Sequence, residues 1–417
     1  MTTLAGITSI KDLPIENKRV FIRVDFNVPL EEQPDGTQVI SDDARIVEAL
    51  PTIKHAIERG ARVILASHLG RPKGRDPKLS LEPVGARLAE LLGVEVHIPE
   101  DCIGDAAKKV VFDLRAGQVC LLENLRFHPE EEKDDEAFAQ KLAELCDVYV
   151  DDAFGAVHRA HASVHALPKL MRERGCGFLL EKEIAALGKI INNPDKPFVA
   201  VLGGTKVSDK IKVLESLLEK VDALVIGGAM ANTFLAARGA NMQASKIEDD
   251  KLALARTILE KAREKKIDLV LPVAVVVANN LHASEGTIVD VGAIPEGFMA
   301  LDIGPKSIAL FRTYFDKAKS VFWNGPMGLF EKPAFSNGTF SVARALAASH
   351  AFTVIGGGDS ASAVKEAGEG VAQKFSHIST GGGASLELIE GKKLPGIEVL
   401  RRSAAAVAAG APPATGA

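Results

Sequence analysis

Short apolar runs alternate with amphipathic stretches along most of this 417-residue sequence. The apolar runs that read as strands occupy residues 20–26, 63–67, 119–122, 148–151, 198–202, 223–226, 269–271, 321–323 and 352–355. The stretches between them that read as helices include residues 45–59, 84–92, 136–145, 206–220 and 251–265. Strands that are apolar throughout are buried on both faces, and their alternation with helices is typical of parallel sheets. The sequence therefore predicts an α/β fold with two doubly wound, Rossmann-like parallel sheets, one in each half.

A connector helix is predicted between the two halves. Its apolar residues recur at helical spacing, and they are Leu180, Ile184, Leu187 and Ile191. Pro194 follows, and proline ends a helix because it lacks the backbone N–H and disfavours helical geometry in the residue before it. We expect this segment to act as a hinge.

The length of the chain favours two domains, because one ordinary hydrophobic core does not extend over 417 residues. We expect an N-terminal domain at residues 1–178, the connector at 179–194 and a C-terminal domain at 195–390. Residues 391–402 are expected to return to the N-terminal domain. Residues 403–417 form a low-complexity tail rich in alanine, glycine and proline, and we expect its end to be disordered.

The composition excludes several classes of function. A net charge of -5 gives no reason to expect a nucleic-acid or membrane partner. The longest apolar run, residues 269–278, is too short to span a bilayer. The four cysteines include no CxxC pair, so neither a zinc site nor a disulfide framework is predicted and buried, reduced thiols are expected. The N-terminus has no signal-type apolar segment, which favours a cytoplasmic location.

In the first half, polar residues follow the predicted strands at the points where they end. Such residues include Arg71, Arg126 and Arg159, and Arg45 lies at the start of a predicted helix. Ligands of open parallel sheets bind at the carboxyl ends of the strands, so these arginines are expected to converge. Guanidinium forks match phosphate and carboxylate oxygens, which favours a small polyanionic ligand with His68 and His161 nearby. Scattered surface salt bridges are the alternative interpretation.

Two further polar groups in the first half are interpreted as surface features. The acidic run at residues 130–136 reads as a solvated loop that leads into a helix. His158, His161 and His165 have a spacing that suggests a metal, but they lack a partner with ligand spacing. We therefore expect a polar loop or helix face there.

In the second half, glycine clusters follow the strands. Gly203-Gly204 precedes a predicted helix that places Lys206 and Lys210 on one face. Further clusters of this kind are Gly227-Gly228, Gly356-Gly357-Gly358 and Gly381-Gly382-Gly383. Glycines allow the backbone to approach a phosphate, and the first N–H groups of a helix attract anions. The GxxxxGK[ST] phosphate-binding motif does not occur, and glycine caps with surface lysines are the alternative.

Two acidic residues of the second half are candidate ligand-binding groups. Asp359 follows the third glycine of its cluster and is expected to be a helix N-cap or a magnesium ligand. Glu331 follows a turn that ends a strand, and its carboxylate is positioned to accept hydrogen bonds from ribose hydroxyls or to face solvent.

Taken together, these segments resemble the phosphoglycerate kinase family. Arg23-Val24-Asp25-Phe26-Asn27-Val28-Pro29 resembles the opening signature of the family. Matching stretches follow in family order at residues 68–72, 121–128, 151–163, 203–210, 322–331, 356–360 and 377–387. The resemblance extends over residues 11–396. Thr205 and Ser360 depart from the usual residues of the family, but both keep a small side chain.

The resemblance implies two domains that face each other across a cleft and a reversible phosphoryl transfer. The phosphoryl group would pass from 1,3-bisphosphoglycerate to MgADP, giving 3-phosphoglycerate and MgATP, with a carboxyl group as the acceptor in the reverse direction. The residues that would bind the three-carbon acid are Asp25, Phe26, Asn27, Arg45, His68, Leu69, Gly70, Arg71, Arg126 and Arg159. The residues that would bind the nucleotide are Gly204, Lys206, Lys210, Gly228, Asn324, Pro326, Glu331, Gly357, Gly358, Asp359, Ser360 and Gly382.

The same resemblance assigns catalytic roles to Arg45, Lys206 and Lys210, a Mg²⁺ contact to Asp359, and a monomeric state. Phosphoryl transfer requires in-line alignment and positive charge around the moving group, and a carboxylate acceptor needs no general base. We expect Arg45 to come from the first half and Lys206 from the second. A non-catalytic nucleotide-binding relative and another acyl-phosphate kinase, such as one acting on acetate, are the alternatives. The arginine-rich first half favours a substrate with a second anionic group.

Overall fold

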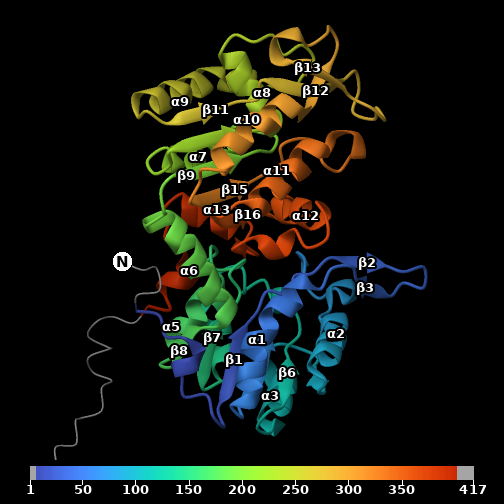
Figure 1. The fold of residues 1–417 in the computed structure, drawn as a ribbon. Coiled ribbons are helices and arrows are strands. Elements are labelled where there is room, and N and C mark those ends of the chain that lie inside the picture. The colour runs from blue at the N-terminus through green and yellow to red at the C-terminus, as the bar shows by residue number, and fades with distance from the viewer. Residues whose placement is uncertain (1–5, 402–417) are drawn as a thin grey trace, which may run out of the picture. The chain divides into compact units, whose positions relative to one another are not determined.

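The structure is a computed structural model that describes residues 6–401. The chain folds into two compact units (Figure 1). Unit 1 contains the described residues up to 185 together with those from 393, and unit 2 contains residues 186–392. The division falls inside α6 (Phe178–Asn192), the predicted connector helix. The predicted tail at 403–417 lies outside the described residues.

Unit 1 contains a six-stranded sheet in the order β5-β6-β4-β1-β7-β8, in which neighbouring strands are parallel. The strands are β1 (Arg19–Arg23), β4 (Arg62–Ala66), β5 (Val96–His97), β6 (Val119–Leu121), β7 (Val148–Asp151) and β8 (Arg174–Cys176). A separate antiparallel hairpin consists of β2 (Leu30–Glu32) and β3 (Gln38–Ile40). After β1 the chain proceeds toward β4, and after β7 toward β8. The sheet therefore has its switch point between β1 and β7, where doubly wound folds bind ligands.

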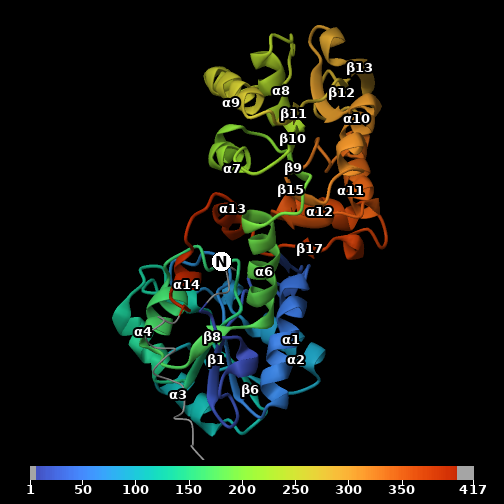
Figure 2. The same ribbon diagram turned by 60° about the vertical axis from the view of Figure 1, so that its left-hand side comes forward.

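Helices cover both faces of this sheet. Figure 2 shows α1 (Ala44–Glu58) and α2 (Glu82–Leu92) on one side of the strands, with α3 (Gly104–Asp113) and α4 (Glu136–Ala143) on the other. The short helices α5 (Leu167–Leu170) and α14 (Pro395–Glu398) complete the unit. Apolar residues of the strands pack against the inner faces of α1 and α2 and form one buried core. This core keeps water away from the strands and from both helices.

Unit 2 contains a second six-stranded parallel sheet, in the order β11-β10-β9-β15-β16-β17. The strands are β9 (Phe198–Leu202), β10 (Ala223–Ile226), β11 (Asp268–Val270), β15 (Ser320–Asn324), β16 (Phe352–Gly356) and β17 (His377–Ile378). Its switch point lies between β9 and β15. The prediction of one parallel sheet in each half is confirmed.

The helices of unit 2 also lie on both faces of its sheet. Figure 2 shows one set on one side, α7 (Ile211–Leu217), α8 (Gly228–Ala237) and α9 (Leu252–Glu264). The opposite side carries α10 (Pro305–Phe315), α11 (Asn337–Ala348) and α12 (Gly358–Glu366). The short helix α13 (Gly383–Ile389) packs against α7.

Unit 2 also contains a three-stranded antiparallel sheet, which was not predicted. It has the order β13-β12-β14, with β12 (Ala274–Ala278), β13 (Thr287–Asp290) and β14 (Met299–Ile303). The predicted long apolar run at 269–278 divides at Pro272 into β11 and β12. β13 is largely exposed and short, so it lacks the apolar pattern by which a strand is recognised in a sequence.

The helix predicted at residues 206–220 is wrong at its start, because α7 begins only at Ile211. The preceding residues form a turn and a 3₁₀ segment, Ser208–Lys210. The backbone N–H groups of Val207 and Ser208 and the Ser208 hydroxyl donate to the Glu248 carboxylate. These bonds hold the segment as a loop, so Lys206 and Lys210 do not share a helix face.

All four cysteines are buried free thiols, as predicted. Within residues 6–401, every helix is too short or too polar to cross a lipid bilayer.

The first turn of α6 is hydrogen-bonded to a buried carboxyl group. The Oδ1 atom of Asp152 accepts from the Leu180 N–H at 3.0 Å. Asp152 is fully buried, and burial raises its pKa to about 7. An unfolded aspartate has a pKa of about 3.9, so between these values the folded state holds a proton that the unfolded state releases.

We therefore expect the Asp152 contribution to stability to be largest below about pH 4 and to be lost as the pH rises through about 7. Asp152→Asn keeps the shape and removes the titration. Urea unfolding at pH 4.5 and pH 8 should show a smaller stability difference in this variant than in the parent chain. An equal difference in both proteins would contradict the prediction.

Candidate active site

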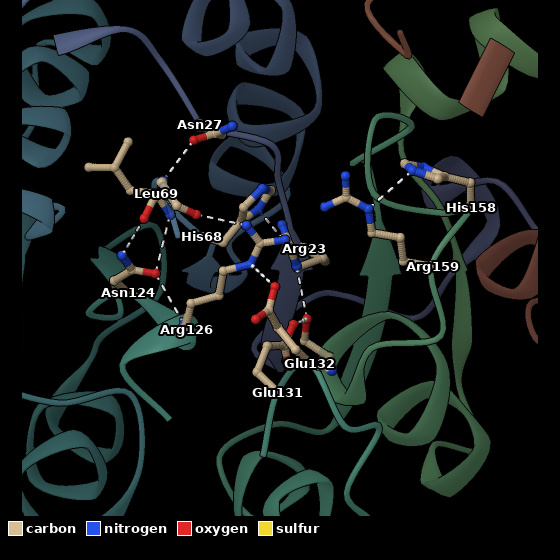
Figure 3. Close-up of polar contacts among 12 residues, drawn as sticks. Arg23, Asn27, His68, Leu69, Asn124, Arg126, Glu131, Glu132, His158 and Arg159 are labelled. Carbon is tan, nitrogen blue, oxygen red and sulfur yellow. Dashed lines mark hydrogen bonds and ion pairs between the residues drawn. The ribbon is translucent and has the colours of Figure 1, made fainter. Parts of the chain in front are cut away.

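A buried arginine that the sequence analysis did not assign to the site lies at its centre in unit 1. Arg23, the last residue of β1, has no exposed surface. Its guanidinium donates to Ser163 Oγ at 2.9 Å, to the Val24 carbonyl oxygen, and to His68 Nδ1 at 3.1 Å (Figure 3). An arginine within an apolar strand was counted as part of the strand pattern. Its position directly before the Asp25-Phe26-Asn27 turn is the signal that could have identified it as a site residue.

The acidic run at 130–136 is not a fully solvated loop, and this interpretation is wrong for Glu131. Glu131 is completely buried, and its carboxylate accepts from Ser163 Oγ at 2.5 Å and from the Ser163 N–H at 2.9 Å. Burial raises the pKa of Glu131, while the positive charges of Arg23 and Arg126 oppose this effect. Ser163, in the π-helical turn Ala162–Ala166, thereby links Glu131 to Arg23.

Four guanidinium groups act on His68, which is buried at the carboxyl end of β4. Burial lowers the His68 pKa well below its usual value, and the charges of Arg23, Arg126, Arg159 and Arg45 lower it further. Burial and nearby arginines also lower the pKa of His161 to about 4. Both imidazoles are therefore neutral at neutral pH, and the positive charge of this region resides on the arginines.

Arg126 is held by the loops that follow β4 and β6. Its Nη1 donates to the Gly70 carbonyl oxygen at 2.7 Å, and its Nε lies 3.3 Å from Glu132 Oε1. Asn124 braces the same loops (Figure 3), because its Oδ1 accepts from the Arg126 N–H at 3.1 Å and its Nδ2 donates to the Leu69 carbonyl oxygen at 2.8 Å. The Arg126 guanidinium is thus fixed in position before any ligand arrives.

The remaining predicted residues of unit 1 differ in accessibility. Arg45 Nη1 pairs with Asp25 Oδ1 at 2.9 Å, and the Arg45 side chain is 38% exposed. The Asn27 Oδ1 accepts from the Gly70 N–H at 2.8 Å. Arg71 is exposed, and Arg159 is partly buried, with its Nε donating to His158 Nε2 at 3.1 Å. Phe26 and Leu69 belong to the apolar core, so only their backbone groups are placed to contact a ligand.

Unit 2 contains a cavity of about 420 Å³ at the carboxyl ends of its strands. Apolar side chains make up much of the wall, including Met299, Leu301 and Pro326. The predicted residues that line it are Gly204, Gly228, Pro326, Glu331 and Asp359. Asn232, Lys246 and Asp302 also line it but were not predicted, because they lie on elements without a recognisable motif.

The loops after β9, β10 and β15 are hydrogen-bonded to one another around this cavity. Gly204 N–H donates to the Pro326 carbonyl oxygen at 2.8 Å, and Gly228 N–H donates to the Met327 carbonyl oxygen at 2.9 Å. A Cβ on Gly228 would lie 2.6 Å from the backbone of Gly204, and Gly228 has a φ of +65°. Gly228 is therefore required by the close approach of two loops, whereas the sequence analysis had explained it by the approach of a phosphate.

Lys210 supports these loops from inside. Its Nζ donates to the Gly203 carbonyl oxygen at 2.7 Å and to the Asn324 carbonyl oxygen at 3.0 Å. Burial lowers the Lys210 pKa to about 8, and the negative charge of Asp359 opposes this shift. Lys206 is exposed. Of the two lysines, Lys206 is therefore the one whose ammonium faces solvent.

The start of α12 departs from one expectation, since the N-cap is Gly357 and Asp359 lies in the first turn. Asp359 is exposed, so its carboxylate is available to a cation. Ser360 is buried, and its Oγ accepts from the Gly325 N–H at 2.6 Å. A Cβ at Gly358 or at Gly382 would meet open space, which leaves room for a ligand beside both backbones.

Asp302 is a buried carboxyl group beside the cavity. It accepts from the N–H groups of Ile303 at 2.8 Å and Gly338 at 2.6 Å, and so joins β14 to the start of α11. Burial raises its pKa to about 7. Asp302 positions the cavity wall that β14 forms.

Comparisons with known proteins agree with this geometry. The family model described as "Phosphoglycerate kinase" matches residues 10–392. The chain is 58% identical to phosphoglycerate kinase of Anaeromyxobacter sp. (strain Fw109-5), over 95% of this chain and 99% of the relative. It is 54% identical to phosphoglycerate kinase of Acidobacterium capsulatum, over 94% of this chain and 98% of the relative. The solved structure of phosphoglycerate kinase from Coxiella burnetii is similar, with a TM-score of 0.86 and 41% identity over 94% of this chain and 98% of that one. The chain therefore belongs to the phosphoglycerate kinase family, as a kinase that transfers a phosphoryl group reversibly between 1,3-bisphosphoglycerate and ADP.

Proposed function

We propose that unit 1 binds the three-carbon acid, that unit 2 binds the magnesium nucleotide, and that the phosphoryl group passes in line between the two ligands. The observation that carries this proposal is the group of arginines around neutral His68. A phosphate and a carboxylate on one small molecule need several fixed guanidinium groups, and neutral histidines beside them provide hydrogen bonds without added charge repulsion.

The tautomer of His68 follows from its neighbour. A guanidinium only donates, so Arg23 leaves Nδ1 as the acceptor and the neutral ring carries its proton on Nε2. His68 is then a donor toward an anionic oxygen of the acid. Arg126 and Arg159 bind the phosphate or carboxylate oxygens with Asp25, Asn27 and Arg71 at the rim. The Glu131–Ser163–Arg23 chain holds His68 in place for this contact.

In unit 2, the apolar part of the cavity suits a purine base, and Glu331 suits the ribose hydroxyls. The N-terminal backbone of α12, including Gly357, Gly358 and Ser360, is oriented for phosphate oxygens. The exposed carboxylate of Asp359 is a hard oxygen ligand of the kind that Mg²⁺ prefers, so it is suited to hold the ion that arrives with the nucleotide. Asn324, Lys210 and Gly204 keep the loops in position, and Gly382 borders the same ligand.

The transfer itself requires charge neutralisation and not proton removal. The carboxylate of 3-phosphoglycerate is already a nucleophile, and Arg45 and Lys206 stabilise the negative charge of the moving group. Arg45 belongs to unit 1 and Lys206 to unit 2, so this proposal has both units act on one phosphoryl group. We expect the connector to bend as a hinge during the reaction. The monomeric state and a cytoplasmic location are part of this proposal. Small-angle scattering with both ligands, compared with either alone, tests the bending and the monomer together.

The acceptor specificity provides the direct test. With MgATP in a coupled ATP-consumption assay, we expect turnover with 3-phosphoglycerate and no turnover above background with acetate. Acetate lacks the second anionic group that the arginines of unit 1 would bind. Equal turnover with both acids would overturn the proposal in favour of a general acyl-phosphate kinase.

A substitution in unit 1 tests the division of ligands. Arg159→Ala should raise the KM for 3-phosphoglycerate by at least tenfold, because a charged hydrogen-bond donor worth about 1.5–3 kcal/mol is removed. The KM for MgATP, measured at saturating acid, should change little. An effect on the nucleotide alone would mean that the two units have been assigned the wrong ligands.

A further inference from the structure

Three different metal-ligand side chains gather in unit 1 outside the residues used above. Asp101 and Cys102 lie in the loop between β5 and α3, and His128 follows the 3₁₀ turn Leu125–Phe127. One ligand atom from each lies within 4.8 Å of the others. Asp101 Oδ1 and His128 Nε2 are 2.7 Å apart and partly exposed, while Cys102 is wholly buried behind them. The cluster therefore has two side chains that solvent reaches and one thiol that solvent does not reach.

Two hydrogen bonds join Asp101 to the other two residues of this cluster. His128 Nε2 is within hydrogen-bond distance of Asp101 Oδ1, and the Cys102 N–H donates to the same oxygen at 2.6 Å. The Phe138 ring lies 5.4 Å from the imidazole centre and restricts its orientation. An ordinary Asp–His surface pair needs no buried thiol at its inner end.

We propose that Asp101, Cys102 and His128 bind one Zn²⁺ ion. Sulfur and imidazole nitrogen favour zinc over magnesium or calcium, and three protein ligands with a water complete a tetrahedral set. Binding replaces the thiol proton, which leaves to solvent. Zn²⁺ bonds to the Cys102 thiolate, to the Asp101 carboxylate and to Nε2 of neutral His128, whose ring proton moves from Nε2 to Nδ1. No electron is transferred. The sequence analysis did not predict a zinc site because the cysteine spacing lacks a CxxC pair.

This site is independent of the phosphoryl-transfer proposal, but it is connected to the same turn. His128 lies two residues after Arg126, and the His128 N–H donates to the Leu125 carbonyl oxygen at 3.2 Å. A metal bound at His128 would fix the end of the turn that carries Arg126. The expected consequence is a more rigid turn.

Cobalt(II) provides a spectroscopic test, because a thiolate bound to cobalt gives a charge-transfer band and a tetrahedral site gives intense visible bands. The full-length chain is stripped with a chelator, freed of the chelator and titrated with Co²⁺ in the absence of nucleotide. We expect one Co²⁺ per chain with a thiolate band, and displacement of the cobalt by one equivalent of Zn²⁺. Calorimetry in two buffers of different ionisation enthalpy should detect the released proton.

The variants separate this site from other thiols. Cys102→Ser should abolish the thiolate band, and His128→Gln, which changes a partly exposed residue, should weaken Co²⁺ binding by at least tenfold. Cys120→Ser, which alters another buried cysteine, in β6, should bind like the parent chain. The proposal is overturned if the parent chain gives no thiolate band, if the band persists in Cys102→Ser, or if folded His128→Gln binds Co²⁺ as tightly as the parent.

Discussion

Replacing Arg45 with alanine should lower the turnover number by about 100- to 1000-fold while leaving the fold intact. Removal of one donor that stabilises transition-state charge typically costs about 3–4 kcal/mol. Arg45 is suited to this role because it stands in the first turn of the 15-residue helix α1. Among the described residues, its one ion pair is with Asp25, at the same edge of unit 1. Turnover is measured at saturating concentrations of both substrates, and circular dichroism reports the fold.

Arg87 of α2 is a matched control for Arg45. Its side chain is 40% exposed and pairs with Asp43 at 2.8 Å, but it lies outside the proposed site. Arg87→Ala should therefore keep normal turnover. Arg45→Lys keeps the charge but loses the planar fork, so its turnover should fall between the two. Near-normal turnover in a folded Arg45→Ala chain would remove Arg45 from the proposed mechanism.

The second large effect is expected from Glu131→Ala. This change should destabilise the chain by about 3–5 kcal/mol, which is the usual cost of removing one partner from a buried charged pair or network. Ser163 would lose the acceptor of its hydroxyl and N–H, and Arg23 would lose a compensating negative charge within the buried interior. Urea unfolding followed by far-UV circular dichroism would measure the loss of stability. Tryptophan fluorescence is less suitable, because Trp323 lies in unit 2 and Glu131 in unit 1.

Glu136→Ala is the appropriate comparison, since Glu136 belongs to the same acidic run but is exposed in the first turn of α4. Its effect should remain within about 0.5 kcal/mol, as for most exposed positions. Glu131→Gln keeps the shape and one acceptor oxygen, so its cost should be intermediate. If the two alanine variants lose equal stability, the buried network does not hold Arg23 as described.

The sheets could be predicted because their central strands are short, continuously buried apolar runs, for example β9 and β10. The strands β5, β8 and β17 were not predicted, because each has only two or three residues and is partly exposed. Such runs differ from the amphipathic segments around them, and a doubly wound fold then follows from the alternation. The placement of arginines at strand ends was likewise predictable, because the chain order of strands and turns fixes which end of the sheet each turn occupies.

The buried polar network could not be predicted. Residues 130–132 are three consecutive glutamates, which the sequence does not distinguish. In the fold, Glu131 accepts a hydrogen bond from Ser163, 32 residues away. Glu132 is exposed and pairs with Arg126. The loop at Lys206 has the same origin, since the groups that end its helical geometry belong to Glu248. In both places, hydrogen bonds between residues far apart in the sequence determine the structure more than the local helix or loop propensity does. The residues around each position do not indicate these bonds.

The return of the chain to unit 1 has a consequence for biosynthesis. Leu394, Ile397 and Leu400 are buried, and the Gly396 N–H donates to the Val157 carbonyl oxygen at 2.9 Å. A ribosome releases these residues only after it has made all of unit 2. The polypeptide segment that is translated first therefore waits longest for its final core residues, and a nascent chain can finish its later unit before its earlier one.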